Sequence, residues 1–132
     1  MNCSRKTKEI MDTFNLESVI NDLPHKVNIL GSEYKIKYLT EKESQTLCQY
    51  DGWCDSYKKE IIIEKTLFED EITSKRGYEV LRHEIIHGFI FESGLSANCD
   101  WARNEELVDW IALQFPKLNK CLEKFIKKGE SL

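Results

Sequence analysis

Apolar residues in the first 24 positions recur at a loose helical spacing. They stand among charged residues, and Pro24 ends the pattern; the apolar positions are Ile10, Phe14, Leu16, Val19, Ile20 and Leu23. Because a helix brings every third or fourth residue to one face, this spacing predicts an N-terminal helix over residues 1–24, with a candidate break at Asn15.

Alternation of apolar and polar residues replaces the helical period over residues 26–65. The segment KVNILGSEYKIKYL alternates around Gly31 and Ser32, which predicts a β-hairpin. The segment TLCQYDGWCDSYKKEIIIEK continues the alternation, with Asp51 and Gly52 as a turn signal and β-branched residues at positions 61–63. We expect a meander of three or four antiparallel strands, forming a small antiparallel or mixed sheet.

Helical spacing returns in the last half of the chain. It predicts a helix over residues 74–93, with Ser74 as its N-cap and Gly94 at its left-handed C-cap. A second helix is expected to end before Pro116 and a third to follow it, which gives a packed helix pair over residues 100–128. The order of helix, strands and helices predicts one α+β domain over residues 1–132.

Composition and charge narrow the class of protein. The chain is 41% hydrophobic and 32% charged, as is usual for a folded globular domain. Its formal net charge of -4 argues against direct nucleic-acid binding, which usually needs a basic face. The apolar runs are too short to cross a bilayer and no signal peptide opens the sequence, so we expect a cytoplasmic protein without a membrane partner.

The five cysteines are an odd set without a CxxC pair. In a chain of this length, such a set indicates reduced thiols rather than a disulfide framework. Their spacings also differ from those of zinc fingers, so buried cysteines without a chemical role are the favoured interpretation.

Two of the three histidines lie four residues apart in the segment HEIIH, residues 83–87. On a helix, His83 and His87 lie about 40° apart in azimuth and one turn apart along the axis, so both imidazoles can reach one ion. Glu84 lies on the same side of the helix, close enough to take a proton from water at that ion. This HExxH pattern is typical of zinc hydrolases, although it also occurs by chance.

A third ligand is expected from a helix that packs beside the first. In the segment NEELVDWIA, a face buried through Val108 and Ile111 would bring Glu105 to its flank and turn Glu106 away. Asp109 follows Glu105 by one turn and can hydrogen-bond the outer nitrogen of a ligating histidine. The alternative is that these acids form a solvated charged face.

HEIIH followed by NEELVD resembles the gluzincin arrangement of HExxH with a downstream NExxxD. The small size and element order are most similar to the ImmA/IrrE family of compact metallopeptidases, which is common in phages and mobile elements. The resemblance implies a zincin-like fold with zinc on His83, His87 and Glu105, catalytic base Glu84, and Asp109 hydrogen-bonded to His83. The chain departs from the usual family pattern at Ile86, Val108 and Asp109.

These patterns predict a zinc-dependent endopeptidase of narrow specificity towards a protein or peptide substrate, and the resemblance suggests a repressor-like regulator. An edge strand in the segment KKEIIIE could pair with an extended substrate, which makes Glu60, Ile61 and Ile62 candidate substrate contacts. The alternative is a central core strand. Tyr78 is a further candidate contact. His25, Tyr57 and Tyr78 are the candidate oxyanion donors, but the spacing does not select among them and a structural role is the favoured interpretation of each.

Two other classes of function remain open from the sequence. One is a zinc-bearing regulatory protein that uses this fold to bind a partner without turnover, and the other is a metal-free helical interaction domain. The oligomeric state is left undecided by these patterns.

Overall fold

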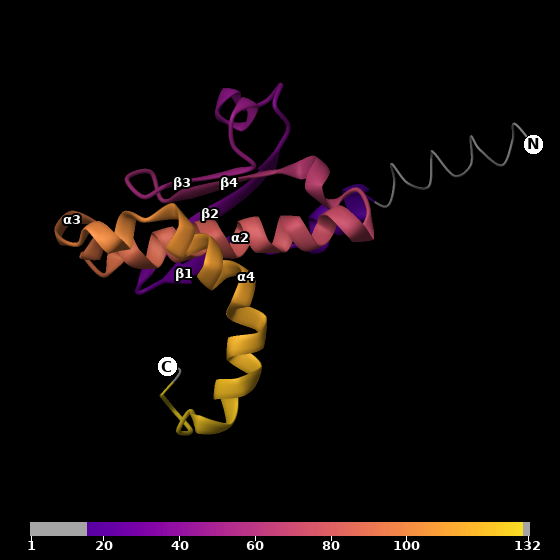
Figure 1. Ribbon diagram of the computed structural model, residues 1–132. Coiled ribbons are helices and arrows are strands. Elements are labelled where there is room, and N and C mark those ends of the chain that lie inside the picture. The colour runs from indigo at the N-terminus through magenta and orange to yellow at the C-terminus, as the bar shows by residue number, and fades with distance from the viewer. Residues whose placement is uncertain (1–15, 131–132) are drawn as a thin grey trace, which may run out of the picture.

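The computed structural model describes residues 16–130 and has an α+β fold (Figure 1). A helix over residues 16–22 precedes a four-stranded sheet, and the later half of the chain is helical. Ile20 and Leu23 of the first segment are buried in the core. Ile10, Phe14 and the predicted break at Asn15 lie outside the described residues.

The sheet is mixed, not a simple antiparallel meander. Its strands are ordered β1-β2-β4-β3, and they comprise β1 (Lys26–Ile29), β2 (Ser32–Leu39), β3 (Gly52–Asp55) and β4 (Glu60–Glu64). β4 pairs parallel with β2 and antiparallel with β3. The connection over residues 40–51, which includes the 3-10 helix η1 (Gln45–Cys48), carries the chain past the sheet so that β4 can return between β2 and β3.

Two tight turns hold the hairpins. Leu30 and Gly31 adopt positive φ angles of 51° and 95°, a two-residue turn that matches the twist of β1 and β2. The second hairpin turns at residues 56–59, not at the predicted Asp51–Gly52. Asp55 Oδ1 accepts hydrogen bonds from the backbone N–H groups of Tyr57 and Lys58 at 3.1 and 3.0 Å, which fixes that turn.

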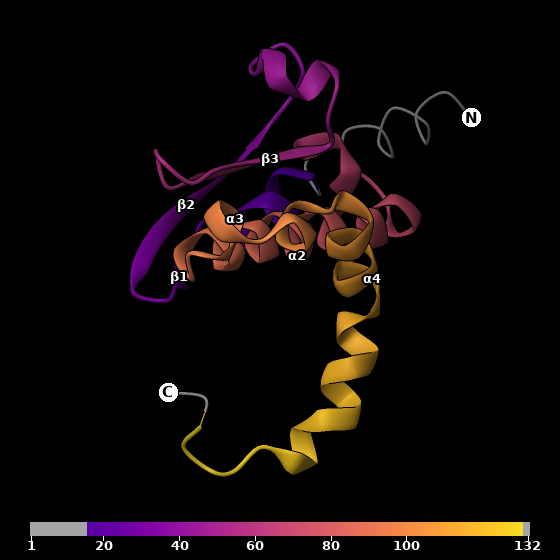
Figure 2. The same ribbon diagram turned by 60° about the vertical axis from the view of Figure 1, so that its left-hand side comes forward.

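One face of the sheet packs against the long helix α2 (Glu71–Glu92), as Figures 1 and 2 show. The alternation in β2 turns its buried residues towards α2 and its lysines towards the outside. The largest fully buried side chains are Tyr34, Ile29, Ile61, Ile63 and Val108. The sheet therefore supplies a rigid floor beneath the helix that carries HEIIH.

The N-cap of α2 lies four residues before the one predicted from the sequence. Its N-cap is Asp70, not Ser74, and the Asp70 carboxylate accepts from the backbone N–H groups of Ile72 and Thr73, both at 2.8 Å. Gly94 follows the helix with φ of 80°, so the predicted left-handed residue at its end is present. The short helix α3 (Leu95–Asn98) and the 3-10 helix η3 (Asp100–Arg103) then lead into the last helix.

The predicted pair of C-terminal helices is one helix, α4 (Glu105–Leu122), which continues through Pro116. Proline has no N–H to donate to the carbonyl four residues earlier, and this loss usually breaks a helix. Here Arg82 Nε of α2 donates to that carbonyl, Ala112 O, at 2.7 Å. A side chain from the neighbouring helix thus satisfies the acceptor that Pro116 leaves open, and α4 remains continuous.

The distal half of α4 does not pack as the sequence suggested. Leu118, Leu122, Phe125 and Ile126 are 43–83% exposed, and Phe125 belongs to the 3-10 helix η4 (Glu123–Phe125) that follows. Within residues 16–130, none of the helices combines the length and the apolar character needed to cross a bilayer.

Candidate metal centre

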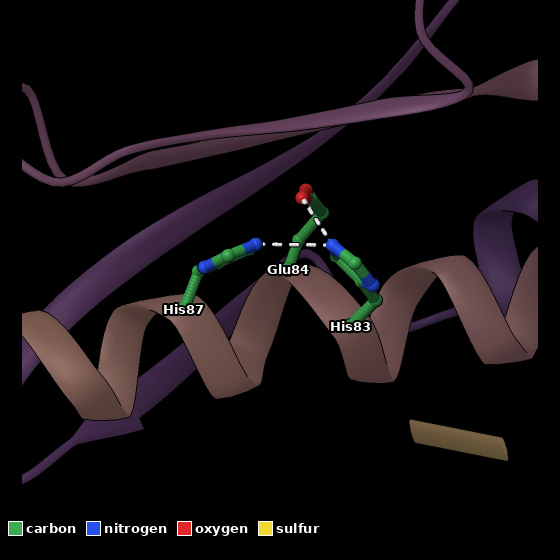
Figure 3. A group of neighbouring side chains, drawn as sticks. All are labelled: His83, Glu84 and His87. Carbon is green, nitrogen blue, oxygen red and sulfur yellow. Dashed lines mark hydrogen bonds and ion pairs between the residues drawn. The ribbon is translucent and has the colours of Figure 1, made fainter. Parts of the chain in front are cut away.

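The two histidines of α2 meet above the helix, as Figure 3 shows. His83 Nε2 and His87 Nε2 lie 3.0 Å apart, and the two rings are T-shaped with centroids 4.7 Å apart. The four-residue spacing produces this convergence because one helical turn separates the residues. The Glu84 carboxyl group lies between the helix and the strand above it (Figure 3).

Glu105 completes a triangle of candidate ligand atoms from α4. Its Oε2 lies 3.0 Å from His83 Nε2, and its Oε1 lies 3.1 Å from His87 Nε2. Asn104 caps α4 by accepting from Leu107 N at 2.9 Å, which places Glu105 in the first turn. The neighbouring Glu106 is exposed, and the contacts to both histidines come from Glu105, as the helical geometry predicted.

Glu84 also lies near the histidines, but as the more distant carboxyl group. Its carboxyl oxygen is within 4.8 Å of both imidazole donors, and it lies 3.9 Å from His83 Nε2. Glu105 is nearer to both rings, at 3.0 and 3.1 Å. We therefore place Glu105 in the candidate ligand set and Glu84 beside it.

Asp109 fixes the orientation of His83. Its Oδ1 lies 2.7 Å from His83 Nδ1, and because a carboxylate can only accept, Nδ1 carries the proton. In the neutral tautomer that carries this proton, Nε2 keeps a lone pair that is directed towards Glu105 and His87. This tautomer is the one that a metal ligand requires.

The donor set fits a divalent cation such as zinc. Two imidazole nitrogens and a carboxylate oxygen are the usual protein ligands of catalytic zinc, and in a tetrahedral site such atoms lie about 3.3 Å apart. With Glu105 Oε2 as the oxygen, the three separations here are 3.0, 3.0 and 3.2 Å. Lone pairs that face one another at this distance repel unless a proton or a cation lies among them, so these residues suit a metal ion.

Glu84 is a buried acid beside the candidate metal ligands. The residue is 5% exposed, and its Oε2 has no hydrogen-bond partner among the described residues. Burial raises the pKa of Glu84 to about 8, and the negative charges of Glu105 and Asp109 raise it further in the same direction. Gly52 of β3 allows this packing, because a Cβ atom there would lie 3.1 Å from Glu84 Cγ and 2.6 Å from Val80 Cγ1.

A groove passes over the candidate metal centre. One part, of about 500 Å³, extends from His83, Glu84 and His87 towards α3 and is bordered by Trp53, Ile90, Phe91, Ala102 and Arg103. A smaller part, of about 170 Å³, continues over Glu84 and Glu105 to Asp51, Arg76 and Asp109. β3 lines the larger part through Gly52, Trp53 and Cys54, and it borders the smaller part through Gly52.

The predicted substrate contacts on β4 are wrong. β4 lies inside the sheet between β2 and β3, Ile61 is 0% exposed, and neither Glu60 nor Ile62 lines the groove. The alternative interpretation of a core strand is the observed one. β4 is central because the non-local pairing with β2 outweighs the charges at its ends, and β3 takes the edge position next to the site.

The other candidate contacts also lie away from the groove. Tyr78 packs edge-on against Phe68 at 5.5 Å between ring centroids, and His25 Nε2 lies 3.0 Å from Ile20 O. Tyr57 is 88% exposed in the hairpin turn. The structure therefore does not bring any of these three side chains to the metal centre.

Sequence reasoning missed the side chains of β3 that line the groove. Trp53 and Cys54 follow Gly52, which was interpreted as a turn residue and is the first residue of a strand. Burial raises the pKa of the Cys54 thiol to about 11, so this sulfur is protonated at neutral pH. The signal that could have located these residues is the alternation Gly-Trp-Cys-Asp, which resembles a short strand as well as a turn.

Comparison with known proteins leaves the family unassigned. No protein-family model, curated protein or solved structure matches this chain at a significant level, so the resemblance to the ImmA/IrrE family rests on HEIIH, NEELVD, the small size and the element order.

Proposed function

We propose that this protein is a zinc-dependent peptidase whose metal ligands are His83, His87 and Glu105. The observation that carries the proposal is the triangle of two Nε2 atoms and one carboxylate, with sides of 3.0–3.1 Å, built from two helices. Zinc, when bound, supplies Lewis acidity that polarises a carbonyl group and lowers the pKa of water.

Glu84 is proposed as the general base. Its carboxyl group lies beside the histidines, with Oε1 3.9 Å from His83 Nε2, where it can take a proton from water and return it to the leaving amine. The pKa of Glu84 falls when positive charge is placed among the three carboxylates Glu84, Glu105 and Asp109. The carboxyl group can then accept a proton near neutral pH, which it cannot do while burial keeps it protonated.

The substrate is proposed to be an extended peptide lying along β3. This strand is at the edge of the sheet and borders both parts of the groove, so its outer backbone groups can pair with a peptide across the metal centre. β3 thus takes the role that the sequence suggested for β4. The proposed substrate is a protein regulator in the cytoplasm. That this regulator is a repressor is suggested by the family resemblance alone.

Zinc binding is the first test. Purified protein is stripped with a chelator and titrated with zinc in competition with a chromophoric indicator. We expect one zinc per chain for the wild type and for Glu106→Gln, and a severe loss of affinity for His87→Ala. Equal zinc affinity in the wild type and His87→Ala would contradict the metal site.

Hydrolysis is the second test and separates an enzyme from a binding protein. The zinc-loaded chain is incubated with a complex peptide library, and new termini are identified by mass spectrometry. We expect cleavage by the wild type and Glu106→Gln, and a reduction of about 10²–10⁴-fold for Glu84→Gln with zinc still bound. Zinc binding without any cleavage would favour the regulatory binding protein that the sequence left open.

A further inference from the structure

α4 carries a heptad pattern of apolar residues that runs far beyond its contact with α2. The spacing alternates between three and four residues in the order Val108, Ile111, Phe115, Leu118, Leu122 and Phe125. This is the a/d pattern with which one helix packs against another helix. We call the last four of these residues the distal stripe.

Packing divides the pattern into two parts. Val108 is 1% exposed against the body of the protein, whereas the distal stripe is exposed by 43–83%. Figures 1 and 2 show that the distal half of α4 extends away from α2 and the sheet, so its apolar side is accessible. The distal stripe and Ile126 expose apolar surface on the order of 400–500 Å², a size that marks interaction sites on other proteins.

Charge placement on α4 suits another helix as the occupant. The positions that flank the distal stripe hold the uncharged residues Gln114, Asn119 and Cys121. Lys117, Lys120 and Lys124 lie on the opposite side of the helix by azimuth. Two copies of this stripe can therefore pack together without bringing like charges into their contact.

We propose that the distal stripe pairs with the same stripe of a second copy of this chain, as an antiparallel homodimer. Antiparallel pairing puts the two bodies at opposite ends of the paired helices. It also directs the lysine-rich end of each helix towards the acidic start of the other, where Glu105, Glu106 and Asp109 lie. Burial of roughly 1,000 Å² in total is at the small end of specific interfaces, so the dissociation constant is expected at about 10–100 µM.

A second copy fits better than an anionic membrane surface. Residues 113–130 contain five lysines and two glutamates, so the rest of the chain carries a formal net charge of -7. That acidic body would be repelled by an anionic bilayer and attracted by the basic helix of another copy.

Sedimentation velocity on the full chain, from about 5 to 500 µM, tests the proposal. The wild type is expected to shift from monomer to dimer. Leu118→Glu with Leu122→Glu should remain monomeric, because four charges would meet in the interface. Lys42→Gln with Lys75→Gln makes the same change in net charge at exposed positions outside α4 and should dimerise like the wild type. Circular dichroism confirms that the variants fold.

Cross-linking at Cys121 tests the orientation of the two helices. In the antiparallel register that packs Leu118 against the partner's Leu122, the two Cys121 thiols lie near the two-fold axis. A short bismaleimide is expected to link wild-type dimers, and Cys121→Ser should abolish this product while Cys48→Ser leaves it unchanged. Linkage that survives Cys121→Ser would overturn the antiparallel pairing.

Two further results would overturn the dimer. The first is either a wild-type protein that stays monomeric at about 500 µM, or a dimer that persists in the variant with Leu118→Glu and Leu122→Glu. The second is a monomeric chain that sediments with vesicles containing phosphatidylserine and loses this binding in the two-glutamate variant, which would assign the stripe to a membrane surface.

Discussion

Two polar clusters on α2 illustrate the difference between a structural and a functional arrangement of charge. Near the end of the helix, the Glu92 carboxylate accepts from Tyr34 Oη at 2.7 Å and Ser32 Oγ at 3.2 Å, and it forms an ion pair with Lys59. Every group there has a donor matched to an acceptor. About two turns earlier, the cluster around His83 contains three carboxyl groups and two imidazoles. Asp109 accepts from His83 Nδ1, but the two Nε2 atoms and the Glu105 carboxylate face one another.

The two clusters respond to protonation in opposite directions. The Lys59 ammonium, and then the Tyr34 hydroxyl, hold the pKa of Glu92 below its ordinary value. Burial, in contrast, raises the pKa of Glu84 to about 8. The matched cluster is therefore complete in the protein itself, while the unmatched one is completed only by a proton or a cation.

The largest expected effect that tests this comparison is on zinc affinity. Glu105→Gln removes the carboxylate that lies 3.0 and 3.1 Å from the two imidazoles, so zinc affinity should fall by more than about 100-fold. Glu106→Gln, with the same chemical change one residue later, should leave the affinity unchanged. Competition with a chromophoric chelator measures both. Equal losses in the two variants would reject the assignment of Glu105.

The next effect concerns the stability of the zinc-free protein against pH. The pKa of Glu84 is raised from 4.5 to about 8 on folding. The protonated side chain therefore stabilises the folded protein fully below about pH 4.5, and this stabilisation is lost as the pH rises through 8. Glu84→Gln retains the neutral form, so at about pH 9 it should be more stable than the wild type by about 2–3 kcal/mol. Urea unfolding at about pH 4 should show a much smaller difference. A difference that does not change with pH would contradict the buried acid.

Glu92 should show the reverse dependence, and it serves as the comparison for Glu84. Its pKa is lowered on folding, so its contribution is present above the ordinary carboxyl pKa and is lost as the pH falls through the folded value. Glu92→Gln should therefore destabilise the protein at neutral pH and approach the wild type in acid. Plots of unfolding free energy against pH should therefore depart from the wild type at high pH for Glu84→Gln and at neutral pH, but not in acid, for Glu92→Gln.

A smaller effect is expected from the partner of His83. Asp109→Asn keeps a hydrogen-bond acceptor near Nδ1 but removes the negative charge that orients the imidazole, so zinc affinity should fall by about 10-fold. The expected loss is thus smaller than that from Glu105→Gln. Zinc titration at fixed pH measures the ratio of the wild-type and variant affinities. An unchanged affinity would show that Asp109 is a surface residue without a role in zinc binding.

The smallest effect belongs to the matched cluster. Tyr34→Phe removes one of the donors to Glu92 from a fully buried ring, so the free energy of unfolding should fall by about 1 kcal/mol, with no change in zinc binding. Chemical denaturation and zinc titration on the same sample check both parts. Any loss of zinc affinity in this variant would show that the two clusters are not independent.

Local patterns predicted the parts of this protein that depend on neighbours in the chain. The spacing of His83 and His87 required only one helical turn, and the choice of Glu105 over Glu106 required only the azimuth of each residue. The hairpin at Gly31 followed from its turn chemistry in the same way. The contacts among these three side chains and the hairpin are confirmed, because helix periodicity and tight turns involve residues fewer than five positions apart, whereas the ligand roles stay a prediction.

Errors arose where a distant contact determined the outcome. A proline at position 116 is expected to break a helix, yet Arg82 of α2 donates to the Ala112 carbonyl that the proline leaves without a donor. Residues 60–64 have the charged ends of an edge strand, yet parallel pairing with β2 places them inside the sheet. Neither contact has a signal within the segment itself.

The sequence alone determined the identity and spacing of the candidate metal-binding side chains, because a helix converts a four-residue interval into a fixed direction. Tertiary structure alone decided which strand lies beside them, whether α4 continues past its proline, and that Glu84 is buried. Burial and strand order depend on surfaces that meet only after folding, and those surfaces also raise the pKa of Glu84. The proposed chemistry depends on both levels of organisation.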